Sequence, residues 1–267
     1  MSNRSQPRSD TQTASPRRVG RRAPYAVLST RPLHILAFLA PLILVYEVCS
    51  ALYLTDPESG AMETIRAHRL MYGFFEVFGV SGVYLPGAVI VVVLLVWHLM
   101  LRDPWFLRGR TLAGMLLESC AWALPMLVMW QVVSLAITGA GELAAAEAGG
   151  SGLAGMSLPA RLTIAVGAGI YEELLFRMLG IAALHFVACD LLRMKNRVGA
   201  VVAVVGTAAA FALYHDVYLA GAGVDWARLL FFFLAGVYFG VIYLWRGFGI
   251  VVATHALYDV VVLTAAG

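Results

Sequence analysis

The chain has 267 residues, of which 61% are hydrophobic and only 13% charged, and its mean hydropathy is +0.81. Soluble domains carry roughly a quarter charged residues, so this composition excludes an ordinary soluble protein and predicts an all-α, polytopic membrane protein. The net charge of +3 is unevenly distributed. The first 32 residues hold seven arginines and one aspartate, a balance of +6, which leaves the remainder of the chain at −3.

The basic N-terminal segment, residues 1–32, is rich in Ser, Arg, Gln, Pro and Thr and has no apolar periodicity. Such a segment cannot bury enough apolar surface to fold, so we expect it to be disordered. A basic tail ahead of an apolar span is typical of a cytoplasmic anchor rather than of a nucleic-acid arm, and no nucleic-acid partner is expected. Residues 33–267 are expected to form one helical transmembrane domain.

Seven apolar runs follow the tail, and most are long enough to cross about 30 Å of hydrocarbon at about 1.5 Å per residue. They lie at about 33–54, 79–101, 112–137, 161–192, 198–220, 227–245 and 248–265. The stretch 70–80 is expected to be an interfacial amphipathic segment. An eighth span remains open, either from this stretch or from division of the long fourth run, so the expected count is seven to eight transmembrane helices.

The connections between the runs alternate in charge. One set of connections is basic and holds Arg102, Arg108, Arg110, Arg193, Lys195, Arg197 and Arg246. The connections that alternate with them hold the acidic residues and one arginine: Asp56, Glu58, Glu63, Glu142, Glu147, Asp225 and Arg228. Because basic connections are usually cytoplasmic, the pattern predicts a cytoplasmic N-terminus. Seven spans then place the C-terminus outside. We expect a multi-pass protein of the cell membrane, in a bacterium, with the lipid bilayer as its surroundings.

A stretch of six residues inside the fourth apolar run holds three charged side chains: Glu172, Glu173 and Arg177. Each ionisable group at bilayer depth costs roughly 2.5–3.5 kcal/mol on insertion scales, so such groups usually line a bundle interior or polar cavity and have a function there. On a helix, Glu173 and Arg177 are i,i+4 neighbours and can pair. Glu172 lies about 100° around the helix and is left to face another partner.

Two later runs supply histidines that can meet these charges. Phe211 and His215 are i,i+4 neighbours in the fifth run, and His255 and Asp259 have the same spacing in the last run. We expect one intramembrane cluster. Two carboxylates and two imidazoles can bind or deprotonate a water molecule and stabilise the negative charge that develops when it attacks a carbonyl group.

The ordered set of three motifs, Glu172-Glu173-x-x-x-Arg177, Phe211-x-x-x-His215 and His255-x-x-x-Asp259, resembles the CAAX-processing and bacteriocin-processing (Abi) family of intramembrane endopeptidases. The resemblance covers about residues 160–265, the motif-bearing core. It implies an all-helical intramembrane protease that cleaves membrane-associated peptide or protein substrates. It also implies that Glu172 is the water-activating base, that His215 assists it, and that His255 and the last motif position stabilise the oxyanion. Glu173, Arg177 and Phe211 would support these residues.

The last motif position departs from the form that the family often has, because Asp259 stands where Asn is frequent. An ionised aspartate cannot donate a hydrogen bond to an oxyanion. Asp259 would therefore have to be protonated, orient His255, or help to hold a cation.

A metal ion is the alternative to direct catalysis by the side chains. Glu172, His215, His255 and Asp259 could together ligate zinc or another divalent cation. Their separation over three apolar runs gives no local ligand spacing, so we expect no cofactor and favour a glutamate mechanism without metal.

Two other function classes remain open on the sequence. Intramembrane Glu and His also build proton-coupled transporters, although the inverted repeats with broken helices that favour such folds are not found in this sequence. The cluster could also be a structural ion-pair triad in a non-catalytic membrane partner, such as an immunity or maturation scaffold. Glu47, Glu76 and Glu118, which lie in or beside other apolar runs, are interpreted as structural.

Overall fold

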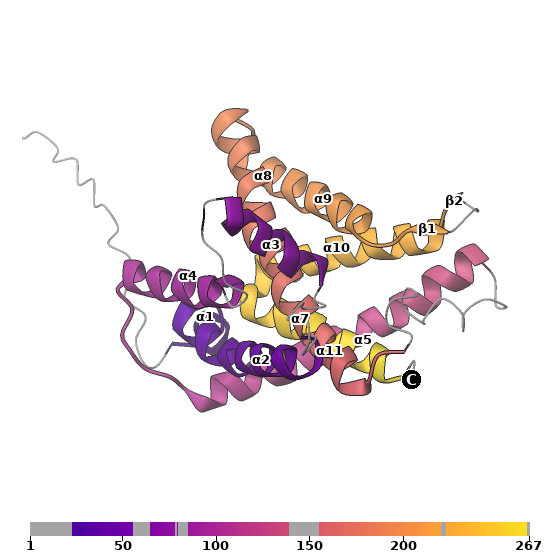
Figure 1. Ribbon diagram of the computed structural model, residues 1–267. Helices are drawn as coiled ribbons and strands as arrows, with labels where there is room; N and C mark the ends of the chain where they lie inside the picture. Colours follow the sequence, from indigo (N-terminus) through magenta and orange to yellow (C-terminus); the bar gives the residue numbers. More distant parts are fainter. Residues whose placement is uncertain are drawn as a thin grey trace, which may run out of the picture.

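The computed structural model describes residues 23–55, 65–77, 79, 85–138, 155–219 and 223–265, and these are almost entirely helical, which confirms the all-α class (Figure 1). The elements are α1 (Tyr25–Leu28), α2 (Pro32–Tyr53), α3 (Arg66–Val77), α4 (Leu85–Leu101), α5 (Gly109–Thr138), α7 (Leu158–Glu173), the π-helical η1 (Leu174–Ile181), α8 (Ala182–Phe186), the π-helical η2 (Val187–Leu191), α9 (Asn196–Tyr214), α10 (Trp226–Arg246) and α11 (Phe248–Ala265). A short antiparallel ladder of β1 (Tyr218–Leu219) and β2 (Gly223–Val224) connects α9 to α10.

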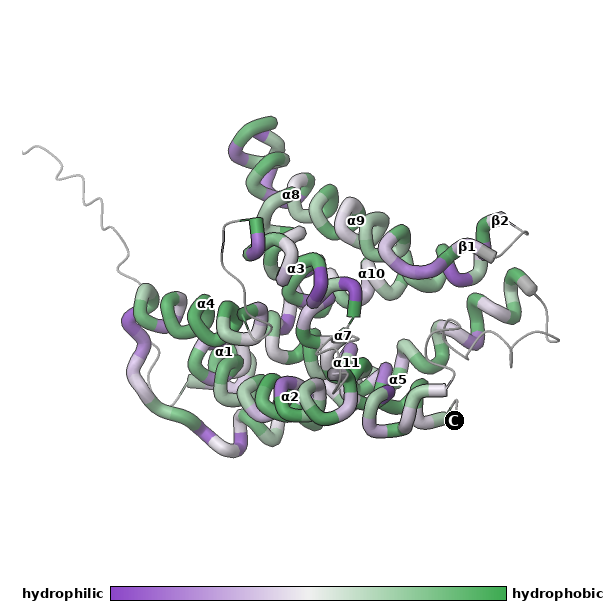
Figure 2. The backbone as a smooth tube through the Cα atoms, in the orientation of Figure 1, coloured by the Kyte–Doolittle hydropathy of each residue, from purple (hydrophilic) through white to green (hydrophobic). Residues whose placement is uncertain are grey.

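Each of the seven predicted apolar runs corresponds to one helix or one continuous helical stretch. Six are long and apolar enough to cross a membrane: Pro32–Tyr53, Gly109–Ile137, Leu158–Leu191, Asn196–Tyr214, Trp226–Arg246 and Phe248–Ala265. The seventh, α4, is equally apolar but has only 17 residues, about 25 Å of helix. Figure 2 shows hydrophobic residues along most of the length of these helices. The protein is therefore an integral, multi-pass membrane protein.

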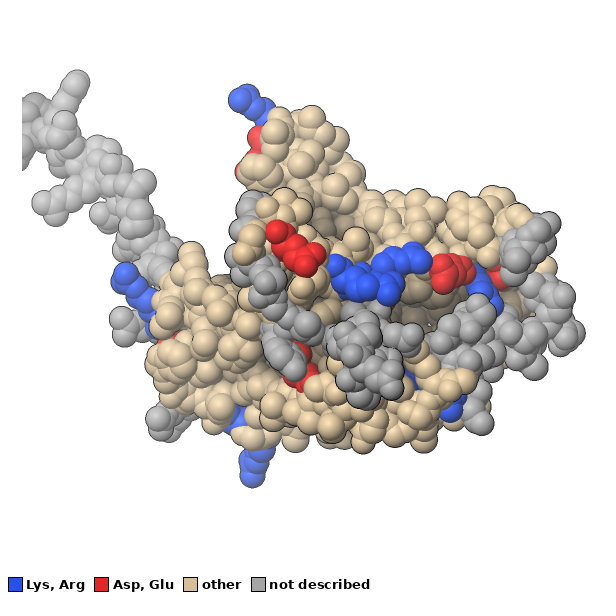
Figure 3. Space-filling model, viewed as in Figure 1, with Lys and Arg blue, Asp and Glu red and all other residues tan. Residues whose placement is uncertain are grey.

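The outer surface is suited to lipid. Leu44, Val128 and Leu213 are each more than 60% exposed, although large aliphatic side chains are usually buried in soluble proteins. On the face shown in Figure 3, charged side chains are few and gathered in small groups, and most of the surface is uncharged. The acidic residues expected in two outer connections, Asp56, Glu58, Glu63, Glu142 and Glu147, lie outside the described residues.

The helix that carries the first charged motif is one continuous stretch of 34 residues, Leu158–Leu191, so the fourth run is not divided into two spans. It begins at Ser157, whose side chain accepts a hydrogen bond from the backbone N–H of Ala160. At Glu173 the α-helix α7 changes into the π-helix η1. π-Helical turns are rare in proteins, and those that occur are often found at functional sites. The position of the motif at this junction fits that tendency.

The interfacial stretch predicted at 70–80 corresponds to α3, which starts four residues earlier and has 12 residues, about 18 Å. That length is too short to span the membrane. One face buries Ala67, His68 and Met71 against the bundle. The other face exposes Leu70, Phe74 and Val77. This helix is therefore no eighth span, and its start lies against the bundle.

Helices α7 and α11 pack together at the centre of the molecule (Figure 1). A Cβ atom added at Gly169 would lie 2.6 Å from the Cβ of Ala256 and 2.7 Å from its backbone nitrogen. Only glycine allows this approach of two helix backbones, as small residues do generally between membrane helices. The contact lies one turn before Glu172 and next to His255, so it brings the two motifs together.

Helices α9 and α10 lie side by side for a similar reason (Figure 1). A Cβ atom at Gly236 would lie 2.7 Å from the Cα of Ala208. The close approach places α10 against the C-terminal half of α9. Phe232 and Phe239 are each about one turn from Gly236, and both reach the site described below.

The N-terminal tail ends earlier than predicted. We expected disorder through Pro32, but residues 23–31 contain α1, in which Leu28 is 1% exposed. The hydroxyl of Tyr25 donates to Glu118 of α5 across 2.5 Å, and Arg246 of α10 binds the same carboxylate. Glu118 is thus structural, as predicted, and three helices are joined through it. Residues 1–22 lie outside the described part of the chain.

Candidate active site

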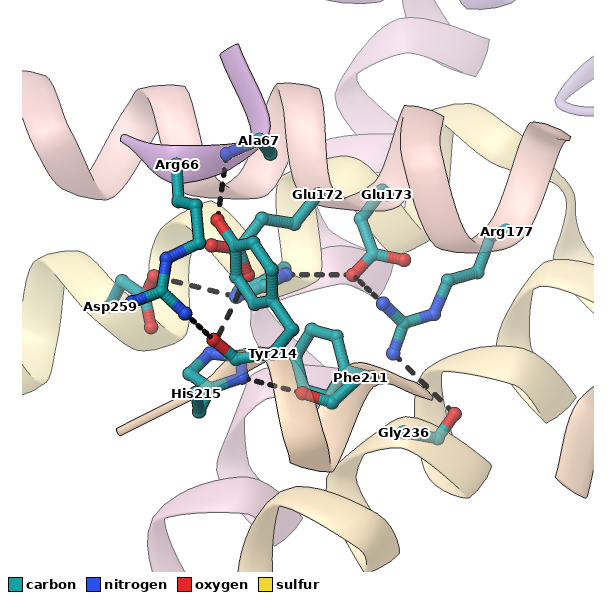
Figure 4. Close-up of polar contacts among 11 residues, drawn as sticks. Arg66, Ala67, Glu172, Glu173, Arg177, Phe211, Tyr214, His215, Gly236 and Asp259 are labelled. Carbon is teal, nitrogen blue, oxygen red and sulfur yellow. Dashed lines mark hydrogen bonds and ion pairs between the residues drawn. The ribbon is translucent and has the colours of Figure 1, made fainter. Parts of the chain in front are cut away.

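The three sequence motifs meet at one place, between α7, α11 and the end of α9 (Figure 4). Glu172 and Glu173 come from the last turn of α7, and His255 and Asp259 come from α11. His215 directly follows α9. The structure therefore brings together every residue that the sequence proposed for the site.

Glu172 lies at the centre of the group. Its Oε2 is 3.7 Å from Nε2 of His215 and 4.0 Å from Nε2 of His255. The residue is only 5% exposed, and within the described residues Oε2 accepts no hydrogen bond. A buried carboxylate oxygen without a donor is costly, so an unpaired oxygen facing two imidazoles is a feature that requires an explanation.

Glu173 has two partners rather than one. Its Oε1 lies 3.0 Å from Nη1 of Arg177, the predicted i,i+4 pair, and 2.7 Å from Nδ1 of His255, which the sequence did not predict. Glu173 is fully buried and Arg177 is 1% exposed. The guanidinium also packs 4.3 Å from the centre of the Phe211 ring. The pair is thus held inside the bundle, with Phe211 as one wall.

His215 differs from the prediction in its backbone. We expected Phe211 and His215 to share a face of one helix, but α9 ends at Tyr214 and His215 is extended, with φ −82° and ψ 161°. Its ring folds back, so that Nδ1 lies 2.8 Å from the carbonyl oxygen of Phe211. Because a carbonyl only accepts, Nδ1 must carry the hydrogen. Nε2 faces Glu172, and in the neutral ring this nitrogen carries a lone pair.

His255 is placed in the opposite way. Its Nδ1 contacts Glu173, and its Nε2 lies 3.4 Å from Oδ2 of Asp259. Each ring nitrogen therefore faces a carboxylate acceptor, and this arrangement suits the doubly protonated ring. The ring stacks on Phe239 with the ring centres 4.7 Å apart. His255 consequently presents an N–H on the nitrogen nearest Glu172, whereas His215 in its neutral form presents a lone pair.

The outer two residues of the site are the more exposed ones. The side chains of His215 and Asp259 are 20% and 22% exposed, compared with 7% for Glu172 and 5% for His255. His215 and Asp259 are therefore the parts of the site nearest the surface, and Glu172 and His255 lie deeper. Asp259 contacts Nε2 of His255, which is the contact needed for the second of its three predicted roles, orienting that histidine.

Sequence reasoning missed several residues around the site. Tyr214 contacts Glu172 and α3, and Phe232 stacks on His215 with ring centres 3.9 Å apart. Phe239 stacks on His255, and Arg66 contacts Tyr214. Only Tyr214 carried a usable signal, since it directly precedes His215 in the sequence.

The four candidate zinc ligands lie close together in the site. In the parts of the chain that the structure describes, no group of three His, Cys, Asp or Glu side chains is arranged to hold a metal ion. Among the four candidate ligands, Oε2 of Glu172 lies 3.7 Å from Nε2 of His215, and Oδ2 of Asp259 lies 3.4 Å from Nε2 of His255.

Comparison with known proteins agrees with the motif-bearing core. No curated protein and no solved structure matches the chain. Residues 154–261 match the family model described as type II CAAX prenyl endopeptidase Rce1-like. These residues hold all three motifs and exclude α1 to α5. The match agrees with the resemblance: residues 154–261, less than half of the chain, are similar to endopeptidases of the CAAX type.

Proposed function

We propose that this protein hydrolyses peptide bonds of membrane-associated substrates, with Glu172 as the base that activates water. The observation that carries the proposal is Oε2 of Glu172, a buried oxygen without a hydrogen bond among the described residues, opposite Nε2 of two histidines at 3.7 and 4.0 Å. These separations are too long for direct hydrogen bonds. A water molecule about 2.8 Å from each atom can bridge them.

The two histidines would act differently on that water and on the substrate. The lone pair on Nε2 of His215 accepts one hydrogen of the water, and Glu172 accepts the other. The water oxygen attacks the carbonyl carbon of the scissile bond as its proton passes to Oε2 of Glu172. The carbonyl oxygen becomes an oxyanion, which accepts a hydrogen bond from the N–H on Nε2 of His255, so that this hydrogen is shared between the oxyanion and Asp259.

Collapse of the intermediate completes the reaction. Glu172 returns its proton to the amide nitrogen, the carbon–nitrogen bond breaks, and the products are a carboxylic acid and an amine. The carboxylate is thereby restored. Glu173 holds His255 through Nδ1 and Asp259 lies at Nε2, so the ring keeps one orientation during the cycle.

The proposed substrates are peptides or proteins that are themselves held at the membrane. Glu172, His255 and Asp259 lie on helices long enough to span a bilayer, and His215 directly follows another, so a substrate in the aqueous phase would have to enter that layer. A lipid-modified C-terminal peptide meets this requirement, and the family description points to such CAAX substrates. We further propose that the reaction needs no metal, because Glu172 and His215 can together accept the hydrogens of the attacking water without one.

The test uses the purified full chain in liposomes and a peptide that ends in a farnesylated Cys, two aliphatic residues and a terminal residue, beside its unlipidated form. Mass spectrometry detects new peptide ends. Wild-type protein should cleave the lipidated peptide, Glu172→Gln should not, and Glu76→Gln, at an exposed glutamate of α3, should cleave normally. Cleavage by folded Glu172→Gln at the wild-type rate would reject Glu172 as the base that activates water. No cleavage of membrane peptides by any variant would favour a non-catalytic scaffold.

A further inference from the structure

Helix α3 lies outside the segment that matches the protease family, yet it contacts the residue directly before each of two proposed catalytic residues. The ring of His68 lies 4.9 Å from the ring of Tyr171, which precedes Glu172. The backbone N–H of Ala67 donates to the hydroxyl of Tyr214, which precedes His215, across 2.8 Å (Figure 4). The first turn of α3 is therefore packed against both motifs.

Arg66 holds Tyr214 from a second side. Its Nη1 donates to the backbone carbonyl of Tyr214, and its guanidinium carbon lies 5.4 Å from the centre of the tyrosine ring. Its Nη2 is 3.3 Å from Asp216. That ion pair is exposed and by itself contributes little to stability. Together the contacts fix the backbone and the ring of Tyr214 relative to α3.

Figure 4 shows the hydroxyl of Tyr214 beside the carboxylate of Glu172, and the electrostatic interaction between the two groups agrees with this placement. A phenol has one hydrogen to donate. Because the oxygen already accepts from Ala67, that hydrogen is available to Glu172. A donor on the carboxylate restricts rotation of the Glu172 side chain, and Oε2 then keeps its position opposite the two imidazoles.

We propose that Tyr214, held by Arg66 and Ala67 of α3, is a positioning residue that orients the carboxylate of Glu172. The inference rests on the proposed hydrolysis by Glu172, and it makes α3 part of the active site although α3 lies outside the matched segment. The proposal concerns the rate of the chemical step, since Tyr214 acts through Glu172.

The decisive variant is Tyr214→Phe. Phenylalanine keeps the ring contacts with Phe176 and His215, at 5.3 and 5.1 Å between ring centres, and loses only the hydroxyl. Displacement of a catalytic group by about 1 Å costs on the order of 100-fold in rate. A carboxylate that is free to rotate but not displaced should cost less. We expect kcat to fall about 10-fold to 100-fold with KM nearly unchanged. The matched control is Tyr218→Phe, at a tyrosine that is 71% exposed.

A second pair of variants tests whether the contacts of α3 with Tyr214 affect catalysis. Arg66→Gln should lower kcat by a smaller factor, and Arg69→Gln, at an exposed position of the same helix, should not. Combining Arg66→Gln with Tyr214→Phe should cost little more than Tyr214→Phe alone, because both changes act through one residue. Arg66 is half-exposed, so this variant remains informative even where Tyr214→Phe folds poorly.

The outcomes separate the inference from the proposed function. Loss of cleavage in Glu172→Gln with wild-type kcat in both Tyr214→Phe and Arg66→Gln would overturn the inference and leave the function standing. Cleavage by Glu172→Gln would overturn the function itself. A fall in melting temperature or a rise in KM without a fall in kcat would show that Tyr214 is merely structural, which also contradicts the proposal.

Discussion

Oε1 of Glu173 lies 2.7 Å from Nδ1 of His255, across the interface between α7 and α11. The second glutamate of the motif is therefore bound both to Arg177 and to the imidazole proposed to stabilise the oxyanion. The contact connects the stability of the bundle with the chemistry of the site, and it changes what substitution of Glu173 should do.

We expect Glu173→Gln to lower both stability and activity. Breaking a buried ion pair by removing one partner typically costs about 3–5 kcal/mol, because the remaining charge is left without compensation. The amide also fails to offer His255 an anionic acceptor, so kcat should fall. Thermal unfolding in detergent and cleavage of the lipidated peptide measure the two effects. A variant with wild-type melting temperature would show that the buried pair contributes nothing to the bundle.

The second prediction concerns the packing of α7 on α11. Gly169→Ala places a methyl group 2.7 Å from the backbone nitrogen of Ala256, so the helices must separate, at a cost of about 1–3 kcal/mol. Separation moves Glu172 away from His255, and activity should fall with stability. Gly73→Ala is the control, since a Cβ at that position meets nothing within 4 Å and alanine favours a helix by about 0.5–1 kcal/mol. Equal behaviour of the two variants would argue against close packing as the reason for Gly169.

The third prediction concerns a metal. In the proposed mechanism, Asp259→Asn keeps the shape of the side chain and offers an amide donor, so it should retain much of the activity and be insensitive to a strong chelator. If a cation were required, the substitution would remove an anionic ligand, and activity would fall and depend on added metal. Chelator-sensitive wild type together with an inactive Asp259→Asn would overturn the metal-free mechanism.

The fourth prediction concerns the side of the membrane on which the C-terminus lies. That side depends on whether α4 crosses the membrane. If α4 crosses the membrane as a seventh span, a reporter fused after Gly267 should be non-cytoplasmic and one inserted near Lys195 should be cytoplasmic. Six crossings would put both termini on one side. A cytoplasmic reporter at Gly267 would therefore mean that α4, with 17 residues, does not cross.

The sequence predicted the spans and the residues of the site because both depend on local patterns. Apolar runs of about 20 residues are unambiguous, and charges within them are rare enough to indicate partners. The pairing of Glu173 with Arg177 followed from helix geometry alone, and the structure confirms it.

What the sequence did not predict depends on contacts between distant segments. The helix α1 is stabilised by Glu118, 93 positions from Tyr25, and the hold on Tyr214 comes from Arg66, 148 positions away. The end of α9 before His215 was also missed, since no glycine or proline stop signal directly follows Tyr214. Partners at such separations leave no periodicity to detect.

The most direct test of the central claim is the rate of appearance of a new peptide end in liposomes, compared between wild type and Glu172→Gln of equal melting temperature. The account predicts cleavage by the wild type and a loss of at least about 100-fold in the variant, because the amide keeps the shape of the side chain but cannot accept the proton. Cleavage by the folded variant at the wild-type rate would contradict the assignment of Glu172 as the base.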